Sequence, residues 1–301
     1  MGCIISMQEH ETTTDGKEEI ASKKHTSTMK TATMDDPVAG EEEQVKKETV
    51  LSIEKNEYSS DLILVLDLDE TLWWMPRCQE EYEDFQNQGW NPSDIGVEHG
   101  VLGVGKERFG FDNPVKLRPG VLDFLKETAF SKKYETVIFT RSRKDGIANL
   151  VIDALAKAVV EYAGGGDKDL KPEDIFSARY FSDSCEDVFG LGMWYCKPLE
   201  QVVRAARGST VAEDDLLKRV VIVDDRSDSY YTCNKYNGIP VRAFSGLRSK
   251  LPSDSTEAID FGEDSVAMFG RLTEILATLE PEDDVRPVLQ ALFSGDDRKF
   301  L

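Results

Sequence analysis

An unbroken aliphatic run at residues 62–66 is followed at once by polar residues with a spacing of two. A run of this length without a polar interruption is typical of a strand buried on both faces, as in a parallel sheet. Asp67, Asp69 and Thr71 come next, and residues two apart in an extended chain project to the same side. Open α/β sheets bind ligands at the carboxyl ends of their strands. The stretch therefore predicts an α/β fold with a polar site at the end of this strand.

A second strand of the same kind, RVVIVDD at residues 219–225, ends in the acids Asp224 and Asp225. Carboxylates this close repel one another, and apolar neighbours make their charge costly. Such a cluster therefore requires a metal ion, a proton on one acid, or both. Two strand ends that each deliver two carboxylates form a hard oxygen cage of the kind that Mg²⁺ prefers. The predicted magnesium ligands are Asp67, Asp69, Asp224 and Asp225.

The segment VLDLDETL, residues 65–72, resembles the first motif of the haloacid dehalogenase superfamily of phosphoryl-transfer enzymes. Within it, the match is to the branch of small C-terminal-domain phosphatases and NLI-interacting factors. The resemblance implies that Asp67 is the nucleophile that becomes an aspartyl phosphate and that Asp69 is the general acid and base. It further implies a three-layer α/β sandwich with a doubly wound, mainly parallel sheet, a small β-hairpin insert and no large cap.

Three later motifs follow in the order that this family has, so that the resemblance covers about residues 61–293. Thr140, after a β-rich run at residues 135–139, matches the threonine whose hydroxyl binds phosphate, and Thr71 is a further phosphate-binding candidate. Lys197 lies in a Y-x-K-x-L pattern and matches the lysine that balances the phosphate charge. The resemblance implies that Asp225 is a direct metal ligand and that Asp224 is a supporting acid for Lys197. Which of these two acids contacts the metal directly stays open.

These residues together predict a Mg²⁺-dependent phosphatase of phosphoserine or phosphothreonine proteins. One alternative is a phosphatase of small metabolites from the same superfamily. The other is a catalytically silent membrane adaptor, against which the intact set of motif residues argues. The aromatic residues after the first motif are candidates to line a substrate groove: Trp73, Trp74, Trp90, Phe109 and Phe111.

The chain begins MGCIIS, which fits the signal for myristoylation of Gly2, with Cys3 as a site for a second acyl chain. Residues 7–60 are rich in Thr, Glu and Lys and have no helical or strand period, which predicts a disordered tether. We therefore expect three parts: a tether with an acylation site (1–60), a phosphatase domain (61–293) and a short tail (294–301). The expected location is intracellular, on the cytoplasmic face of a membrane, with the cytoplasm or nucleus as the alternative.

Charge and cysteine content limit the partners. The formal net charge of −21 argues against direct nucleic-acid binding, which needs clustered Lys and Arg. Five cysteines without a C-x-x-C pattern indicate neither a disulfide framework nor a zinc site. The expected partners are a phosphoprotein substrate and a membrane, and the sequence does not predict an oligomeric state.

Overall fold

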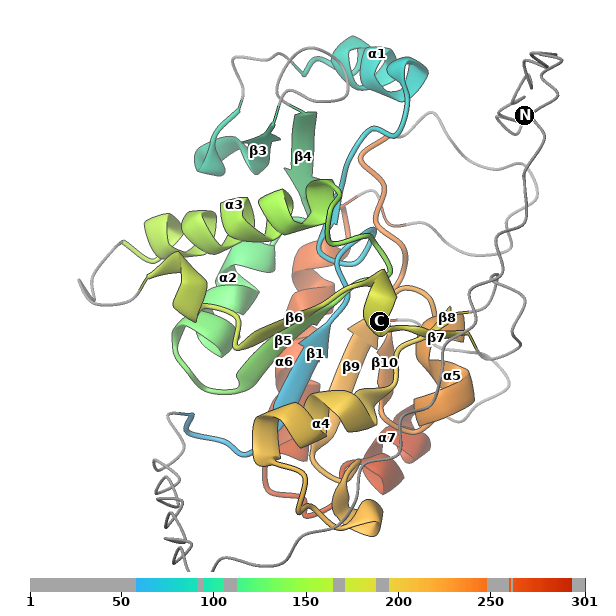
Figure 1. The fold of residues 1–301 in the computed structure, drawn as a ribbon. Coiled ribbons are helices and arrows are strands. Elements are labelled where there is room, and N and C mark those ends of the chain that lie inside the picture. Colours follow the sequence, from blue (N-terminus) through green and yellow to red (C-terminus); the bar gives the residue numbers. More distant parts are fainter. Residues whose placement is uncertain are drawn as a thin grey trace, which may run out of the picture. The chain divides into compact units, whose positions relative to one another are not determined.

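A computed structural model describes residues 58–90, 95–105, 113–164, 171–187, 195–247, 260, 262–293 and 301. Its main sheet has five strands in the order β10-β9-β1-β5-β6, and every neighbouring pair is parallel (Figure 1). The strands are β1 (Ile63–Leu66), β5 (Glu135–Phe139), β6 (Ala178–Tyr180), β9 (Val220–Asp224) and β10 (Gly238–Pro240). The predicted α/β fold with a doubly wound parallel sheet is confirmed.

The strand β1 lies in the middle of this sheet, between β5 and β9. Its register pairs Leu66 with Ile138 on one side and with Val223 on the other. The N–H of Asp67 then donates to the carbonyl of Val223 at 3.0 Å. Because parallel strands end at the same edge of a sheet, the residues that follow β1, β5 and β9 meet there.

Alternate residues of β1 enter two separate cores, one on each face of the sheet. Ile63 and Val65 pack with helices α4 (Leu199–Arg207) and α5 (Asp228–Asn234). Leu62, Leu64 and Leu66 pack on the other face with α2 (Val121–Leu125), α3 (Ile147–Tyr162), α6 (Ser265–Leu279) and α7 (Arg286–Phe293). Each fully buried aliphatic side chain stabilises the fold by roughly 1.5–3 kcal/mol. Helices thus cover both faces, as the predicted three-layer sandwich requires (Figure 1).

An insert between β1 and β5 forms a second, antiparallel sheet in the order β2-β4-β3. Its strands are β2 (Trp73–Trp74), β3 (Val101–Val104) and β4 (Asn113–Leu117), and the helix α1 (Gln79–Asn87) and the 3₁₀ turn η2 (Val97–His99) accompany them. The expected hairpin is therefore a three-stranded sheet with a helix. The sequence of α1 has only two buried apolar residues, Tyr82 and Phe85, which is too few for a recognisable helical stripe.

The tryptophans of this insert are buried, as is more common for aromatic residues than a place in a groove. Trp73, Trp74 and Trp90 are 2%, 6% and 8% exposed, because the last two pack with Tyr82 and Phe85 of α1. Trp74 and Trp90 belong to the core of the insert, whereas Trp73 packs in the larger core that includes β1. Trp73 and Trp74 also reach a cavity described below. Phe109 and Phe111 lie outside the described residues, so their predicted place in a groove stays a prediction.

The remaining described elements are short: the π-helical turn η3 (Lys126–Phe130), the 3₁₀ turns η4 (Pro172–Asp174), η5 (Ser182–Ser184) and η6 (Glu213–Asp215), and the strand pair β7 (Glu186–Asp187) and β8 (Tyr195–Cys196). Cys196 is disulfide-bonded, whereas the cysteine pattern indicated no disulfide framework. Cysteine spacing alone does not reveal which thiols a fold brings together. Cys78 and Cys185 are free. Within the described ranges, no helix is both long and apolar enough to cross a bilayer.

Candidate active site

Three carboxylates gather where β1 and β9 end. One oxygen each of Asp67, Asp224 and Asp225 lies within 4.8 Å of the others. Asp67 and Asp224 are only 6% and 1% exposed, since they continue the two central strands. Three hard oxygen ligands borne on rigid strand ends fit a small divalent cation such as Mg²⁺. The structure thus brings together three of the four predicted ligands.

The electrostatics of this acid group also fit a bound cation. Burial, together with the charges of Asp224 and Asp69, raises the pKa of Asp67 to about 7 in spite of the nearby Lys197. Burial and the charges of Asp67 and Asp224 likewise raise the pKa of Asp225 well above its usual value. The protein's own cations therefore do not balance the negative charge here, and a divalent metal would do so.

Lys197 is the buried cation of the site. Its ammonium contacts Oδ1 of Asp67 and donates to Oδ2 of Asp224 at 2.8 Å. Burial alone would lower the pKa of Lys197, but Asp224 and Asp67 outweigh burial and raise it, so that the side chain is charged at neutral pH. Backbone contacts hold this residue in place, because its N–H donates to the carbonyl of Ser229 at 2.7 Å and its carbonyl accepts from Nδ2 of Asn234 at 2.8 Å.

Thr71 connects the two metal-facing strand ends. Its buried hydroxyl lies 2.9 Å from Oδ1 of Asp225 and 3.2 Å from Oδ2 of Asp67, and it accepts from the N–H of Asp225 at 3.0 Å. These contacts use the hydrogen-bonding capacity of the hydroxyl and hold the two acids in position relative to each other. The structure therefore supports a positioning role for Thr71, whereas direct phosphate binding by Thr71 stays a prediction.

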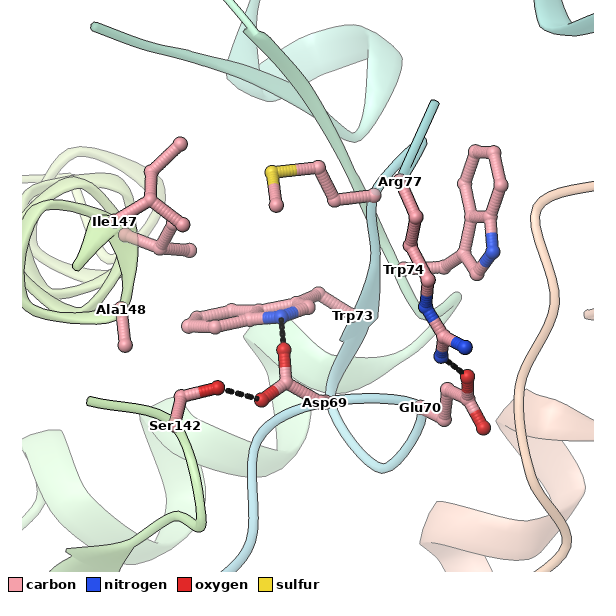
Figure 2. Close-up of a pocket in the computed structure, with 10 residues that line it drawn as sticks. Asp69, Glu70, Trp73, Trp74, Arg77, Ser142, Ile147 and Ala148 are labelled. Atoms are coloured by element: carbon pink, nitrogen blue, oxygen red, sulfur yellow. Dashed lines mark hydrogen bonds and ion pairs between the residues drawn. The ribbon is translucent and has the colours of Figure 1, made fainter. Parts of the chain in front are cut away.

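The carboxylate of Asp69 lies apart from the group of Asp67, Asp224 and Asp225, so its part as a metal ligand stays a prediction. The chain leaves the extended conformation after Asp67: the N–H of Leu72 turns back to the carbonyl of Leu68 at 2.9 Å, and Glu70 has a φ of 64°. A spacing of two places side chains together only while the chain stays extended. The carboxylate of Asp69 instead faces the first turn of α3 and the ring of Trp73 (Figure 2).

Three donors hold the Asp69 carboxylate in that direction. The hydroxyl of Ser142 donates to Oδ2 at 2.7 Å, and the indole N–H of Trp73 donates to Oδ1 at 3.2 Å (Figure 2). The hydroxyl of Thr140 also donates to Oδ2, at 3.3 Å. Thr140 thus lies in the site, as predicted. Ser142 was not among the predicted site residues, although its spacing of two from Thr140 would place both side chains on one side of an extended chain. Trp73 was predicted to line a groove or to lie in the core, and its hydrogen bond to Asp69 was not predicted.

A cavity of about 400 Å³ opens next to Asp69. Apolar side chains form most of its wall, and the ion pair of Glu70 with Arg77 lies at one side (Figure 2). The lining residues are Asp69, Glu70, Trp73, Trp74, Met75, Arg77, Ser142, Ile147, Ala148 and Val151. A cavity of this size with a carboxylate on its wall can receive part of a substrate while that carboxylate exchanges a proton with it.

Comparison with known proteins identifies the family of this chain. A family model described as NLI interacting factor-like phosphatase matches residues 62–286. The fission yeast RNA polymerase II CTD phosphatase Fcp1 bound to beryllium fluoride is 19% identical, with a TM-score of 0.37, over 80% of this chain and 57% of that chain. A haloacid dehalogenase-like hydrolase from Xanthomonas campestris is 15% identical, with a TM-score of 0.32, over 73% of this chain and 98% of that chain. This chain thus spans little more than half of the yeast protein chain, and no curated protein sequence matches it.

Proposed function

Because the chain belongs to the NLI interacting factor-like phosphatases, we propose that it is a Mg²⁺-dependent phosphatase of phosphoserine or phosphothreonine proteins. The observation that carries this proposal is the arrangement around Asp67, whose carboxylate contacts the charged Lys197 and lies within 4.8 Å of Asp224 and Asp225. A buried carboxylate beside a fixed cation and a cation site is suited to attack phosphorus, where negative charge must be stabilised on the phosphoryl oxygens.

In the first step, a carboxylate oxygen of Asp67 forms a bond to phosphorus as the bond from phosphorus to the serine or threonine oxygen breaks. The ammonium of Lys197 compensates the charge on the phosphoryl oxygens. Asp67, Asp224 and Asp225 would hold Mg²⁺, which when bound supplies further positive charge to those oxygens. Asp69 donates a proton to the leaving oxygen, from the orientation that Ser142 and Trp73 impose.

In the second step, Asp69 acts as a base. It takes a proton from a water molecule, whose oxygen attacks phosphorus and releases the carboxylate of Asp67. The products are inorganic phosphate and free enzyme, and Asp69 again carries the proton that the next cycle requires. One carboxylate can do both tasks because the leaving oxygen and the attacking water occupy the same side of the phosphoryl group in turn.

The apolar part of the cavity wall favours a polypeptide substrate over a sugar phosphate, while Asp69, Glu70, Arg77 and Ser142 form the polar part. Met75, Ile147, Ala148 and Val151 offer no hydrogen-bonding groups, so a polyol placed against them would lose its hydrogen bonds to water. An apolar side chain next to a phosphorylated residue would instead gain from burial there. This supports the phosphoprotein proposal over the alternative of a small-metabolite phosphatase.

The test is hydrolysis by the full-length protein, with and without Mg²⁺, of phosphoserine, phosphothreonine and phosphotyrosine peptides and of sugar phosphates. We expect Mg²⁺-dependent release of phosphate from the phosphoserine or phosphothreonine peptides. Higher kcat/KM for sugar phosphates would overturn the protein substrate. The absence of any turnover would favour the silent adaptor. Activity of Asp67→Asn within about tenfold of wild type would overturn the assigned nucleophile.

A further inference from the structure

Two arginines follow directly on residues of the candidate active site and meet at one acid. Arg141 comes after Thr140, and Arg226 comes after Asp225. Nε and Nη2 of Arg226 donate to the two oxygens of Asp228, at 3.2 and 2.8 Å. Nη1 of Arg141 lies 3.8 Å from the same carboxylate. We call Arg141, Asp228 and Arg226 the arginine bridge.

The arginine bridge connects the loops on either side of the nucleophile. Arg141 follows β5 and Arg226 follows β9, and these strands are the two neighbours of β1. Adjacent strands are about 4.8 Å apart, so the two strand ends are roughly 10 Å apart, with Asp67 between them. The hydrogen bond to Asp228 is the main cause of a raised pKa of Arg226, and the charges of Asp225 and Asp224 add to it. The bridge thus lies within electrostatic reach of the acid group.

The backbone fixes one side of this bridge to the catalytic lysine. The N–H of Arg226 donates to Oδ1 of Asp224 at 2.8 Å, and its carbonyl accepts from the N–H of Ser229 at 2.9 Å. The carbonyl of Ser229 in turn accepts from the N–H of Lys197. A ligand held by Arg226 would therefore keep a defined position relative to the reacting group.

The guanidinium of Arg226 is accessible to a ligand, and that of Arg141 is accessible in part, because its Nη1 is buried. The side chains of Arg141 and Arg226 are 25% and 57% exposed. A guanidinium has five N–H donors, and Arg226 uses only its Nε and Nη2 edge for Asp228. The bridge itself carries two positive charges and one negative charge in a chain of net charge −21, and Asp224 and Asp225 lie close to Arg226. Salt screens charges beyond about 8 Å at physiological ionic strength, so contacts at the bridge outweigh the distant acids.

We propose that Arg141 and Arg226 bind a second phosphate of the substrate polypeptide, near the phosphate that is hydrolysed. A phosphate accepts two parallel hydrogen bonds from a guanidinium and carries up to two charges, so it suits this bridge better than a carboxylate side chain does. Asp228 orients both arginines for that ligand. This inference rests on the proposed function, because it specifies which phosphoproteins the same site prefers.

The fold also suggests the direction of the substrate chain. The cavity beside Asp69 is lined from α3, which packs on one face of the sheet, whereas Asp228 begins α5 on the other face. A polypeptide that crosses the mouth of the site could place one side chain in the cavity and the second phosphate at the bridge. The ends of β5 and β9 are roughly 10 Å apart, and an extended chain rises about 3.3 Å per residue. The two phosphates would therefore be separated by roughly three residues or fewer.

The experiment compares peptides of one sequence that carry a single phosphoserine, or that phosphoserine with a second one up to about four residues away on either side. A further set has Glu at the second position. For the full-length wild type with Mg²⁺, kcat/KM should be about tenfold higher for the doubly phosphorylated peptide at one spacing. The Arg141→Gln/Arg226→Gln double variant should lower this ratio towards one. Arg226→Lys should lower it in part, because it keeps the charge and loses the paired donors.

The control is Arg204→Gln, which removes an arginine of α4 that pairs with Glu213 and should leave the ratio as in wild type. A ratio near one at every spacing in wild type, or a ratio that survives the double variant, would overturn the second-phosphate subsite. An equal loss for singly and doubly phosphorylated peptides would also overturn it, because the arginines would then act on the reacting phosphate. Unfolding of both variants in urea shows whether a loss reflects misfolding.

Failure of the proposed function would give a different result from failure of the second-phosphate subsite. If the wild type hydrolyses p-nitrophenyl phosphate and no phosphopeptide, the phosphoprotein proposal is wrong. Titration calorimetry of the same intact peptides then decides the subsite separately. Tighter binding of a doubly than of a singly phosphorylated peptide, lost in the double variant, would support the arginine bridge as a phosphate site. Equal binding of the two peptides would overturn it.

Discussion

The indole Nε1–H of Trp73 donates a hydrogen bond of 3.2 Å to Oδ1 of Asp69, while the same ring lines the cavity beside that carboxylate (Figure 2). One side chain thus contacts both the proposed acid and base and the space where substrate would bind. The ring is 2% exposed, because it packs in the larger core cluster, which includes residues of β1 and of the strands β3 and β4 of the insert. The insert therefore contributes to the orientation of Asp69 as well as to the shape of the cavity.

Trp73→Phe should impair proton transfer more than binding. The variant keeps an aromatic wall and loses the N–H that orients Asp69. We expect kcat/KM for a phosphoserine peptide to fall about tenfold, and kcat/KM for p-nitrophenyl phosphate to fall less, because a good leaving group needs little protonation. Steady-state kinetics with both substrates provide the measurement, and Trp90→Phe is the control for loss of an indole elsewhere in the insert. Equal losses for the two substrates would show that Trp73 acts only through the shape of the site.

Asp67→Asn should abolish turnover and leave the stability of the apoprotein near that of wild type. The substitution removes the nucleophile and at the same time one of three clustered carboxylates, while Asp224 still pairs with Lys197. Urea unfolding without Mg²⁺ should give a free energy of unfolding equal to or slightly above that of wild type. A loss of more than about 2 kcal/mol would mean that the contact of Asp67 with Lys197 outweighs the repulsion among the acids.

Lys197→Met should destabilise the protein strongly. Lys197 is fully buried between Asp67 and Asp224, and its removal leaves these carboxylates without their cation. Breaking a buried ion pair typically costs about 3–5 kcal/mol, and Mg²⁺ should restore part of it by binding the same acids. The measurement is urea unfolding with and without Mg²⁺. Lys218→Met, which breaks the exposed pair with Asp215, should change the free energy of unfolding by less than about 1 kcal/mol.

Asp260→Asn should make the free energy of unfolding depend less on pH in the acidic range. Burial alone would raise the pKa of Asp260, but hydrogen bonds from Ser265 and Arg118 outweigh burial and lower it. A lowered folded-state pKa stabilises the fold above the unfolded pKa of about 3.9, and this stabilisation is lost as pH falls through the folded value. At pH 7 we expect Asp260→Asn to cost about 3 kcal/mol, because Arg118 stays buried without its counter-charge. The difference in the free energy of unfolding between the variant and wild type, measured in urea, should become smaller towards pH 3. A difference that stays constant with pH would contradict a lowered pKa of Asp260 in the folded state.

Anchoring by Gly2 and Cys3 stays a prediction, since both residues lie outside the described part of the chain. One myristoyl chain binds a membrane only weakly and reversibly, so stable attachment needs the second acyl chain. In fractionated cells we expect Gly2→Ala to release the protein fully and Cys3→Ser to leave weak, exchangeable binding. Equal solubility of wild type and Gly2→Ala would refute the anchor and favour the cytoplasm or nucleus.

Local sequence patterns were sufficient to predict the central strands and most of the acid group. The aliphatic runs of β1 and β9 are continuous in the sequence, and parallel strands end at one edge, so these runs alone place Asp67 near Asp224 and Asp225. The positions of Thr140 and Lys197 followed from family resemblance, because a single residue after a strand carries no periodic signal of its own.

The sequence by itself therefore determined the layered α/β architecture, the strand ends that carry the acids, and the class of chemistry they favour. Only the tertiary structure decided which side chains surround them. The turn after Asp67 directs Asp69 away from the metal-facing acids and towards Trp73 and Ser142. Likewise Arg141 meets Asp228 across 87 residues of sequence (228 − 141), because β5 and β9 flank the same strand. Such contacts depend on the path of the chain between the elements, which no local periodicity encodes.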